Sequence, residues 1–338
     1  MRPYLHTPRS PRSPLLLVVA ALAAAVAVAA CGGGEEDTNG PSAAAVCASP
    51  KIVHSPVDSR YLPIVISSDL AVGENRFSLG LIDQEDNTPV TGAQLHLRFA
   101  LRCGDEARPK AEADPSAVTV TRTYAHTHTD GTGETHEAGE VGAYIANVSF
   151  DAPGTWQVEV TGKAGGQEIE PVTPTFSVNE KSFSLSAGDP APRSVQPILK
   201  DVADIRTIDT SDPPIPEMHQ MTVADAVTSG RPTVIVFATP AFCESQICGP
   251  TKSIVDDLFR QYGSQANFVH IEPYDVERIR NAQCDSLFEC RSPLLDEWKL
   301  ESEPWVFLID KDGKIAGKYE GIVSLEELEA ALQQLLVG

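Results

Sequence analysis

The chain has 338 residues and carries 47 acidic against 26 basic side chains, a formal net charge of −21 at pH 7. This charge argues against nucleic acid as a partner and opposes attraction to anionic lipid surfaces. The length favours two domains of ordinary size over one, and an apolar fraction of 42% is enough for real hydrophobic cores.

Residues 1–30 have the layout of a secretory signal peptide, with three arginines, no acid and an apolar run from Leu15 to Ala30. As a helix, this run spans about 24 Å at about 1.5 Å per residue. That is short of the roughly 30 Å hydrocarbon core of a bilayer. A cleaved signal is therefore favoured over a permanent membrane span.

The junction VAVAAC, followed by GGGEED, resembles a bacterial lipobox, with Val28 in place of the leucine common at that position. The resemblance implies that Cys31 is lipid-modified and becomes the new amino terminus. The protein would then be extracytoplasmic, in the periplasm or at the cell surface, and attached to the membrane through acyl chains. The alternative is a cysteine that merely follows an ordinary cleavage site.

Six cysteines remain once Cys31 is assigned to lipid, an even number that suits an oxidising compartment. Sequence alone leaves their pairing open. Proximity along the chain favours three disulfides, Cys47 with Cys103, Cys243 with Cys248, and Cys284 with Cys290. For the last pair, a local structural disulfide is favoured over a second redox pair.

The first half of the mature chain has the pattern of a β-domain. Residues 31–49 are rich in Gly, Ser, Ala and acidic residues, which indicates a flexible tether. Residues 50–180 contain short β-type runs with no helix-period segment between them. In AYIANVSF, for example, Tyr144, Ala146, Val148 and Phe150 occupy alternate positions. These runs predict an antiparallel, immunoglobulin-like β-sandwich, and DAPGTWQVEV resembles the Ig-like modules of bacterial surface proteins.

The second half mixes helix and strand patterns. Residues 181–216, rich in Pro, Asp and Ser, predict a linker or an arm wrapped on the next domain. Within 217–338, Thr222 and Asp225 predict a capped helix, and PTVIVFA and NFVHIE predict strands buried on both faces. TKSIVDDLFRQYG predicts an amphipathic helix. A hairpin is expected around residues 311–313, followed by a terminal helix capped by Ser324.

Residues 217–338 resemble the thioredoxin superfamily, and more closely its extracytoplasmic, membrane-anchored TlpA and ResA-like branch. The resemblance is carried by FATPAFC, by CGP at a helix start, and by SEPWVFLIDKDGKIAGKYEG. It implies an α/β thioredoxin-like fold in which Pro304 is the family's cis-proline and the backbone of Glu303 pairs with a substrate chain. Thr251 stands where the family's second active-site cysteine belongs, which puts the activity in doubt.

Cys248 and Cys243 are the candidate catalytic residues. A thiolate in the first turn of a helix faces unpaired backbone N–H groups, which lower a thiol pKa and favour attack. We therefore expect Cys248 to attack and Cys243 to replace the missing resolving thiol. The nearest acids in sequence are Glu244 and Glu272. An inert structural bridge between the two cysteines, or metal binding by them, remains an alternative.

The segment YAHTHTDGTGETHEAG is a further candidate site. It places His126 and His128 on one face of a strand and His136 across a Gly-rich turn, a set that could bind copper or zinc. A solvated hairpin tip is the favoured interpretation, so no metal and no cofactor are expected.

These features predict a membrane-anchored extracytoplasmic thiol-disulfide oxidoreductase or redox sensor whose partners are protein thiols or disulfides. The alternative is a non-catalytic lipoprotein that binds a partner or copper on a thioredoxin-fold scaffold. The sequence leaves open whether the protein is an enzyme.

Acylation of Cys31 is directly testable. If Cys31 carries the lipid, the mature protein should partition into the detergent phase and the membrane fraction, because acyl chains supply the membrane affinity. Cys31→Ala should release the protein or block its processing. A mature form that is soluble to the same extent in both proteins would contradict the anchor.

Overall fold

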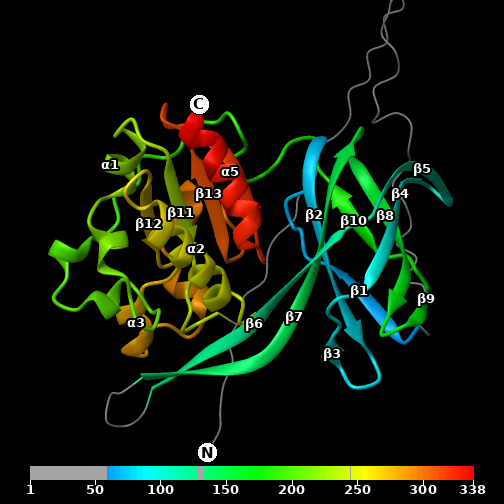
Figure 1. Cartoon of the computed structure of the whole chain (residues 1–338), viewed down its shortest axis with the longest axis horizontal. Coiled ribbons are helices and arrows are strands. Elements are labelled where there is room, and N and C mark those ends of the chain that lie inside the picture. The colour runs from blue at the N-terminus through cyan, green and yellow to red at the C-terminus, as the bar shows by residue number, and fades with distance from the viewer. Residues whose placement is uncertain (1–58, 128–132, 244) are drawn as a thin grey trace, which may run out of the picture. The chain divides into compact units, whose positions relative to one another are not determined.

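The computed structural model describes residues 59–127, 133–243 and 245–338 (Figure 1). All of them fall in one compact unit. The signal segment, Cys31, the tether, Cys47, His128 and Glu244 lie outside the described residues. None of the described helices combines the length and apolar character needed to cross a membrane.

Residues 61–178 form two antiparallel sheets. The first has the order β1-β2-β7-β6, with β3 paired to β2, and consists of β1 (Tyr61–Val65), β2 (Gly73–Asp83), β3 (Thr88–Pro89), β6 (Ser116–Thr127) and β7 (Gly133–Phe150). The second has the order β10-β8-β4-β5, with β9 paired to β8, and consists of β4 (Gln94–Cys103), β5 (Glu106–Ala113), β8 (Gly154–Ala164), β9 (Gln167–Val172) and β10 (Thr175–Val178).

The two sheets share one hydrophobic core. In β7, Tyr144, Ala146, Val148 and Phe150 are buried, which confirms the alternation predicted for this strand. The ring of Phe77 in the first sheet meets that of Phe99 in the second edge to face, with centroids 5.0 Å apart. The sheets therefore pack face to face.

A four-stranded sheet with helices on both faces follows, with the strand order β12-β11-β13-β14. Its strands are β11 (Thr233–Phe237), β12 (Asn267–Ile271), β13 (Trp305–Ile309) and β14 (Ile315–Glu320). Its α-helices are α1 (Val223–Val227), α2 (Cys248–Tyr262), α3 (Val276–Arg280), α4 (Pro293–Glu297) and α5 (Leu325–Val337). Single 3-10 turns are η2 (Leu199–Asp201), η3 (Ile205–Thr207), η4 (Pro216–His219) and η5 (Leu287–Cys290).

Strand β11 is buried on both faces, as its continuous apolar run predicted. Val234 and Val236 belong to the core that α2 and α5 cover, whereas Ile235 and Phe237 belong to the core that α1 and α4 cover. Figure 1 shows α2 and α5 on the same face of the sheet. The sheet thus separates two cores, and α2 begins beside the end of β11.

Local signals in this region are confirmed. Thr222 and Asp225 form the expected capping box, and Ser324 accepts the N–H of Glu327 at 3.1 Å. In the β13–β14 turn, Gly313 has φ +77°, and a Cβ there would lie 2.7 Å from a backbone carbonyl oxygen of α1. The turn therefore requires glycine.

The Pro-rich segment packs as an arm, the second of the two alternatives left open by its composition. The N–H of Gly188 donates to the Ile315 carbonyl at 2.8 Å, and Ala191 donates to the Gly313 carbonyl at 2.9 Å. Ala191 and Ile198 are buried. The segment is therefore held against the β13–β14 hairpin.

Candidate functional site

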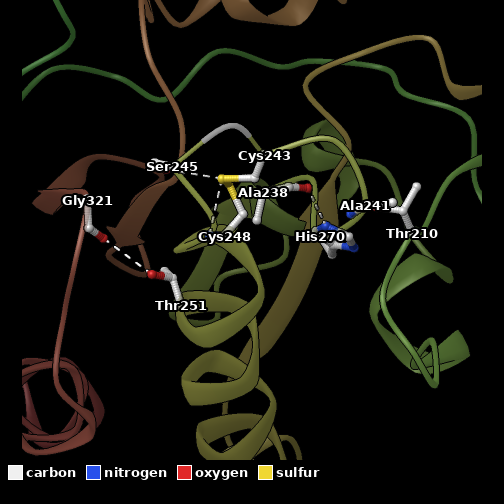
Figure 2. The surroundings of a disulfide bond; sticks show 9 residues. All are labelled: Thr210, Ala238, Ala241, Cys243, Ser245, Cys248, Thr251, His270 and Gly321. Carbon is white, nitrogen blue, oxygen red and sulfur yellow. Dashed lines mark hydrogen bonds between the residues drawn. A yellow bond between two sulfur atoms is a disulfide. The ribbon is translucent and has the colours of Figure 1, made fainter. Parts of the chain in front are cut away.

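Cys243 and Cys248 form a disulfide at the start of α2, with their Cα atoms 6.0 Å apart (Figure 2). The pairing expected from proximity is confirmed. Strand β11 leads into the loop that carries Cys243, and α2 begins at Cys248 itself. The pair therefore lies at the carboxyl end of a central strand and the amino end of a long helix.

The other disulfides are separate from this site. Cys284 pairs with Cys290, as expected, with Cα atoms 5.9 Å apart in the insertion between β12 and β13. Cys103 is disulfide-bonded. Its pairing with Cys47 stays a prediction because Cys47 lies outside the described residues.

Two polar groups contact the sulfur of Cys243. The backbone N–H of Cys248 donates to the Cys243 Sγ at 3.3 Å, and the Ser245 hydroxyl lies 3.2 Å from it (Figure 2). The first donor is one of the N–H groups that a helix leaves unpaired at its amino end. A thiolate at Cys243 would therefore keep a backbone donor and face the positive end of the α2 dipole.

The two cysteines are both buried and differ slightly in exposure. Cys243 is 9% exposed, whereas Cys248 is completely buried. Both side chains belong to the core that α2 and α5 cover, Cys248 from the helix and Cys243 from the loop before it. The expectation that Cys248 is the attacking sulfur stays a prediction, and Cys243 is the more exposed of the two residues.

Thr251, which replaces the family's second cysteine, has a structural contact. Its side chain is 2% exposed and its hydroxyl donates to the Gly321 carbonyl at 3.3 Å (Figure 2). This bond joins α2 to the segment after β14. A hydroxyl cannot form a disulfide, so any exchange at this site uses Cys243 and Cys248 alone.

The carboxylate of Glu303 has a position that the sequence analysis did not foresee. A carboxylate oxygen of Glu303 lies within 4.8 Å of the sulfurs of both Cys243 and Cys248. The Glu303–Pro304 peptide bond is cis, as the resemblance implied. The sequence interpretation used only the backbone of Glu303. Its position directly before Pro304 is the feature of the sequence that could have indicated that its side chain lies near the cysteines.

The two acids named from the sequence are not placed at the sulfurs. Glu244 lies outside the described residues. Glu272 is buried, accepts the N–H of Thr210 at 2.6 Å, and has a raised pKa because burial disfavours its charge. It lies close to a second group of buried polar residues, Asp209, His219 and His270.

His270 is 1% exposed, which confirms that its strand is buried.

The histidines of the β6–β7 hairpin are described only in part. The backbone register pairs Tyr124 with His136 and His126 with Glu134. His128 lies outside the described residues, as does the side chain of His126. Among the residues that are described, the groups with metal-ligand spacing are Asp209, His219 and His270, and Cys243, Cys248 and Glu303.

Comparison with known proteins yields little. No family model matches the sequence, and no curated protein matches it. One similar solved structure is provisionally identified as the thiol:disulfide interchange protein DsbE of Chlorobium tepidum. It is 19% identical, with a TM-score of 0.31, over 45% of this chain and 99% of that one.

Glu303→Gln tests the influence of the acid on the disulfide. The carboxylate disfavours a thiolate on either cysteine, so its loss should stabilise the reduced state. The reduction potential of the pair should rise by at least about 20 mV, because two charges at 4 Å interact by about 1 kcal/mol even in water.

Thr251→Val is the matched control, since it removes a nearby hydrogen bond without a change of charge or volume. Its potential should stay close to that of the wild type, although its free energy of unfolding should fall by about 1 kcal/mol. A potential that is unchanged or lower in Glu303→Gln would show that the carboxylate does not act on the sulfurs.

Proposed function

We propose that this protein exchanges disulfides with protein thiols through Cys243 and Cys248 in an extracytoplasmic compartment. In this proposal, residues 217–338 are a thioredoxin-like domain and residues 50–180 an immunoglobulin-like sandwich. The observation that carries it is the bond from the Cys248 N–H to the Cys243 Sγ. It gives the more accessible sulfur of the pair a charge-stabilising donor, which a purely structural bridge does not need.

The proposed exchange begins at Cys243, the more exposed of the two cysteines. A substrate thiolate attacks the Sγ of Cys243, the bond between the two cysteines breaks, and its electron pair leaves on Cys248. The substrate and Cys243 are then joined in a mixed disulfide, and the Cys248 thiolate takes up one proton. A second substrate thiolate attacks the substrate sulfur of that mixed disulfide and releases Cys243 as a thiolate. Two substrate thiols are oxidised and one protein disulfide is reduced.

The reverse reaction uses the same groups. The Cys243 thiolate attacks a substrate disulfide, and Cys248 then attacks Cys243 in the mixed disulfide to release the reduced substrate. Cys248 is the first residue of α2, so the position expected to activate it as a nucleophile also suits it as a leaving group. Glu303, within 4.8 Å of both sulfurs, is placed to hold the proton that the departing or arriving thiol exchanges.

The proposed location follows from the amino-terminal segment. A lipid on Cys31 would hold the protein at the membrane, and residues 32–49 would let the folded part reach its partners. Partners would be proteins with exposed thiols or disulfides, and the net charge of −21 argues against nucleic acid.

Trapping of mixed disulfides tests the proposal. Cys248→Ser leaves the accessible thiol without its resolving partner, so it should accumulate disulfide-linked adducts on Cys243, visible on non-reducing gels and by mass spectrometry. Cys243→Ser leaves only the buried thiol and should trap little. Cys290→Ser is the matched control, because it frees a half-buried thiol, Cys284, that belongs to another disulfide.

Adducts confined to Cys243→Ser would reverse the assigned roles. Equal adduct formation in Cys248→Ser and in the Cys290→Ser control would remove the case for a dedicated exchange site. The pair would then be a structural bridge in a scaffold that binds a partner or a metal.

A further inference from the structure

Asp209, His219 and His270 form a buried group that the disulfide chemistry does not use. Their exposed fractions are 0%, 2% and 1%. Asp209 follows η3, His219 ends η4 and His270 belongs to β12, so the fold brings them together from separate segments. One donor atom from each lies within 4.8 Å of the other two.

The hydrogen bond of His270 leaves its second nitrogen directed at the carboxylate. Its Nε2 lies 2.9 Å from the Ala238 carbonyl oxygen, which only accepts, so Nε2 carries the proton (Figure 2). Its Nδ1 lies 3.4 Å from an oxygen of Asp209, yet makes no hydrogen bond within the described residues. In the neutral ring, Nδ1 and the carboxylate oxygen are both electron-pair donors. Two buried electron-pair donors that face each other repel, and a cation between them would remove this repulsion.

Hydrogen bonds from neighbouring side chains and backbone hold the Asp209 carboxylate in place. One oxygen accepts the N–H of Ser211 at 2.9 Å and also the Ser211 hydroxyl, and the other lies 2.9 Å from the Nε2 of His219. The bonds from Ser211 hold the carboxylate in place, as the partners of a metal-binding carboxylate do.

The neighbouring buried charges do not already neutralise the Asp209 carboxylate. Lys252 is the buried base nearby, and its Nζ bonds the Asp256 carboxylate at 2.5 Å, so its charge is already matched. His219 and His270 also line a cavity of about 360 Å³ together with Glu272. The cavity offers a route of entry and space for a water ligand.

We propose that Asp209, His219 and His270 bind one divalent transition-metal ion, such as zinc or cobalt. Two imidazoles and a carboxylate are ligands that these ions accept, whereas calcium and magnesium prefer oxygen alone. Ligand atoms about 2.0 to 2.1 Å from a tetrahedral ion lie about 3.3 Å apart. Here His219 Nε2 lies 2.9 Å from one carboxylate oxygen of Asp209 and His270 Nδ1 lies 3.4 Å from the other. One ligand atom of each residue lies within 4.8 Å of the other two, so the three groups would draw together around one ion. The ion would displace the proton on the Nε2 of His219, and a water would complete the site.

Metal titration of the oxidised mature protein tests this site, because the disulfide keeps Cys243 and Cys248 from binding the ion. The background should carry His126→Asn, His128→Asn and His136→Asn, which removes the histidines of the β6–β7 hairpin. Titration with Zn²⁺ should then give one equivalent. Co²⁺ should give the visible bands of a four-coordinate ion. Loss of all binding in this background would assign the metal to the hairpin and overturn the proposal.

Asp209→Asn and His219→Gln should each weaken binding at least about tenfold in that background. His96→Gln is the matched control, since His96 is an exposed histidine 2.8 Å from the Asp114 carboxylate. It should bind as the parent does. Undiminished binding in Asp209→Asn would also overturn the proposal.

Substitution of buried residues can unfold the protein, so a measurement on the wild-type protein is also needed. The ring nitrogen resonances of His219 and His270, followed by ¹⁵N NMR, should shift on addition of one equivalent of Zn²⁺, while those of His96 stay unchanged. Unshifted resonances, with both nitrogens of His270 protonated, would show that a proton and not a metal bridges His270 to Asp209. The test does not involve disulfide exchange, so it stands apart from the proposed function.

Discussion

The hydrogen bond from the Cys248 N–H to the Cys243 sulfur sets the character of the disulfide site. It exists because α2 begins at Cys248 and because the loop after β11 brings Cys243 over that helix end. The same arrangement buries Cys248 completely and leaves Cys243 more accessible. In the proposed exchange, Cys243 is the attacked sulfur and would keep a backbone donor as a thiolate, and Cys248 is the leaving group.

The disulfide and the buried histidine group meet at the end of β11. The carbonyl of Ala238, which follows this strand, accepts the Nε2–H of His270, and the chain continues from there into the cysteine loop. In the same loop, the N–H of Ala241 donates to the Thr210 hydroxyl at 3.2 Å, next to Asp209 (Figure 2).

Local signals in the sequence predicted much of the fold, and tertiary contacts decided the rest. The run at β11, the Thr222 and Asp225 capping box and the Gly313 turn each depend on neighbouring residues, so their patterns were sufficient. The exposure of Cys243 depends on the path of its loop, and the position of Glu303 depends on how β13 packs beside it. Asp209 lies in a segment without periodicity, so no pattern linked it to His270.

The reduction potential of the Cys243–Cys248 pair in the folded, wild-type protein tests the central claim most directly. Equilibration with glutathione or dithiothreitol buffers, read by mass spectrometry after acid quenching and alkylation, would resolve this pair from Cys284–Cys290. An exchange site should titrate near or above about −200 mV. A value below about −300 mV, where structural disulfides lie, would contradict the account.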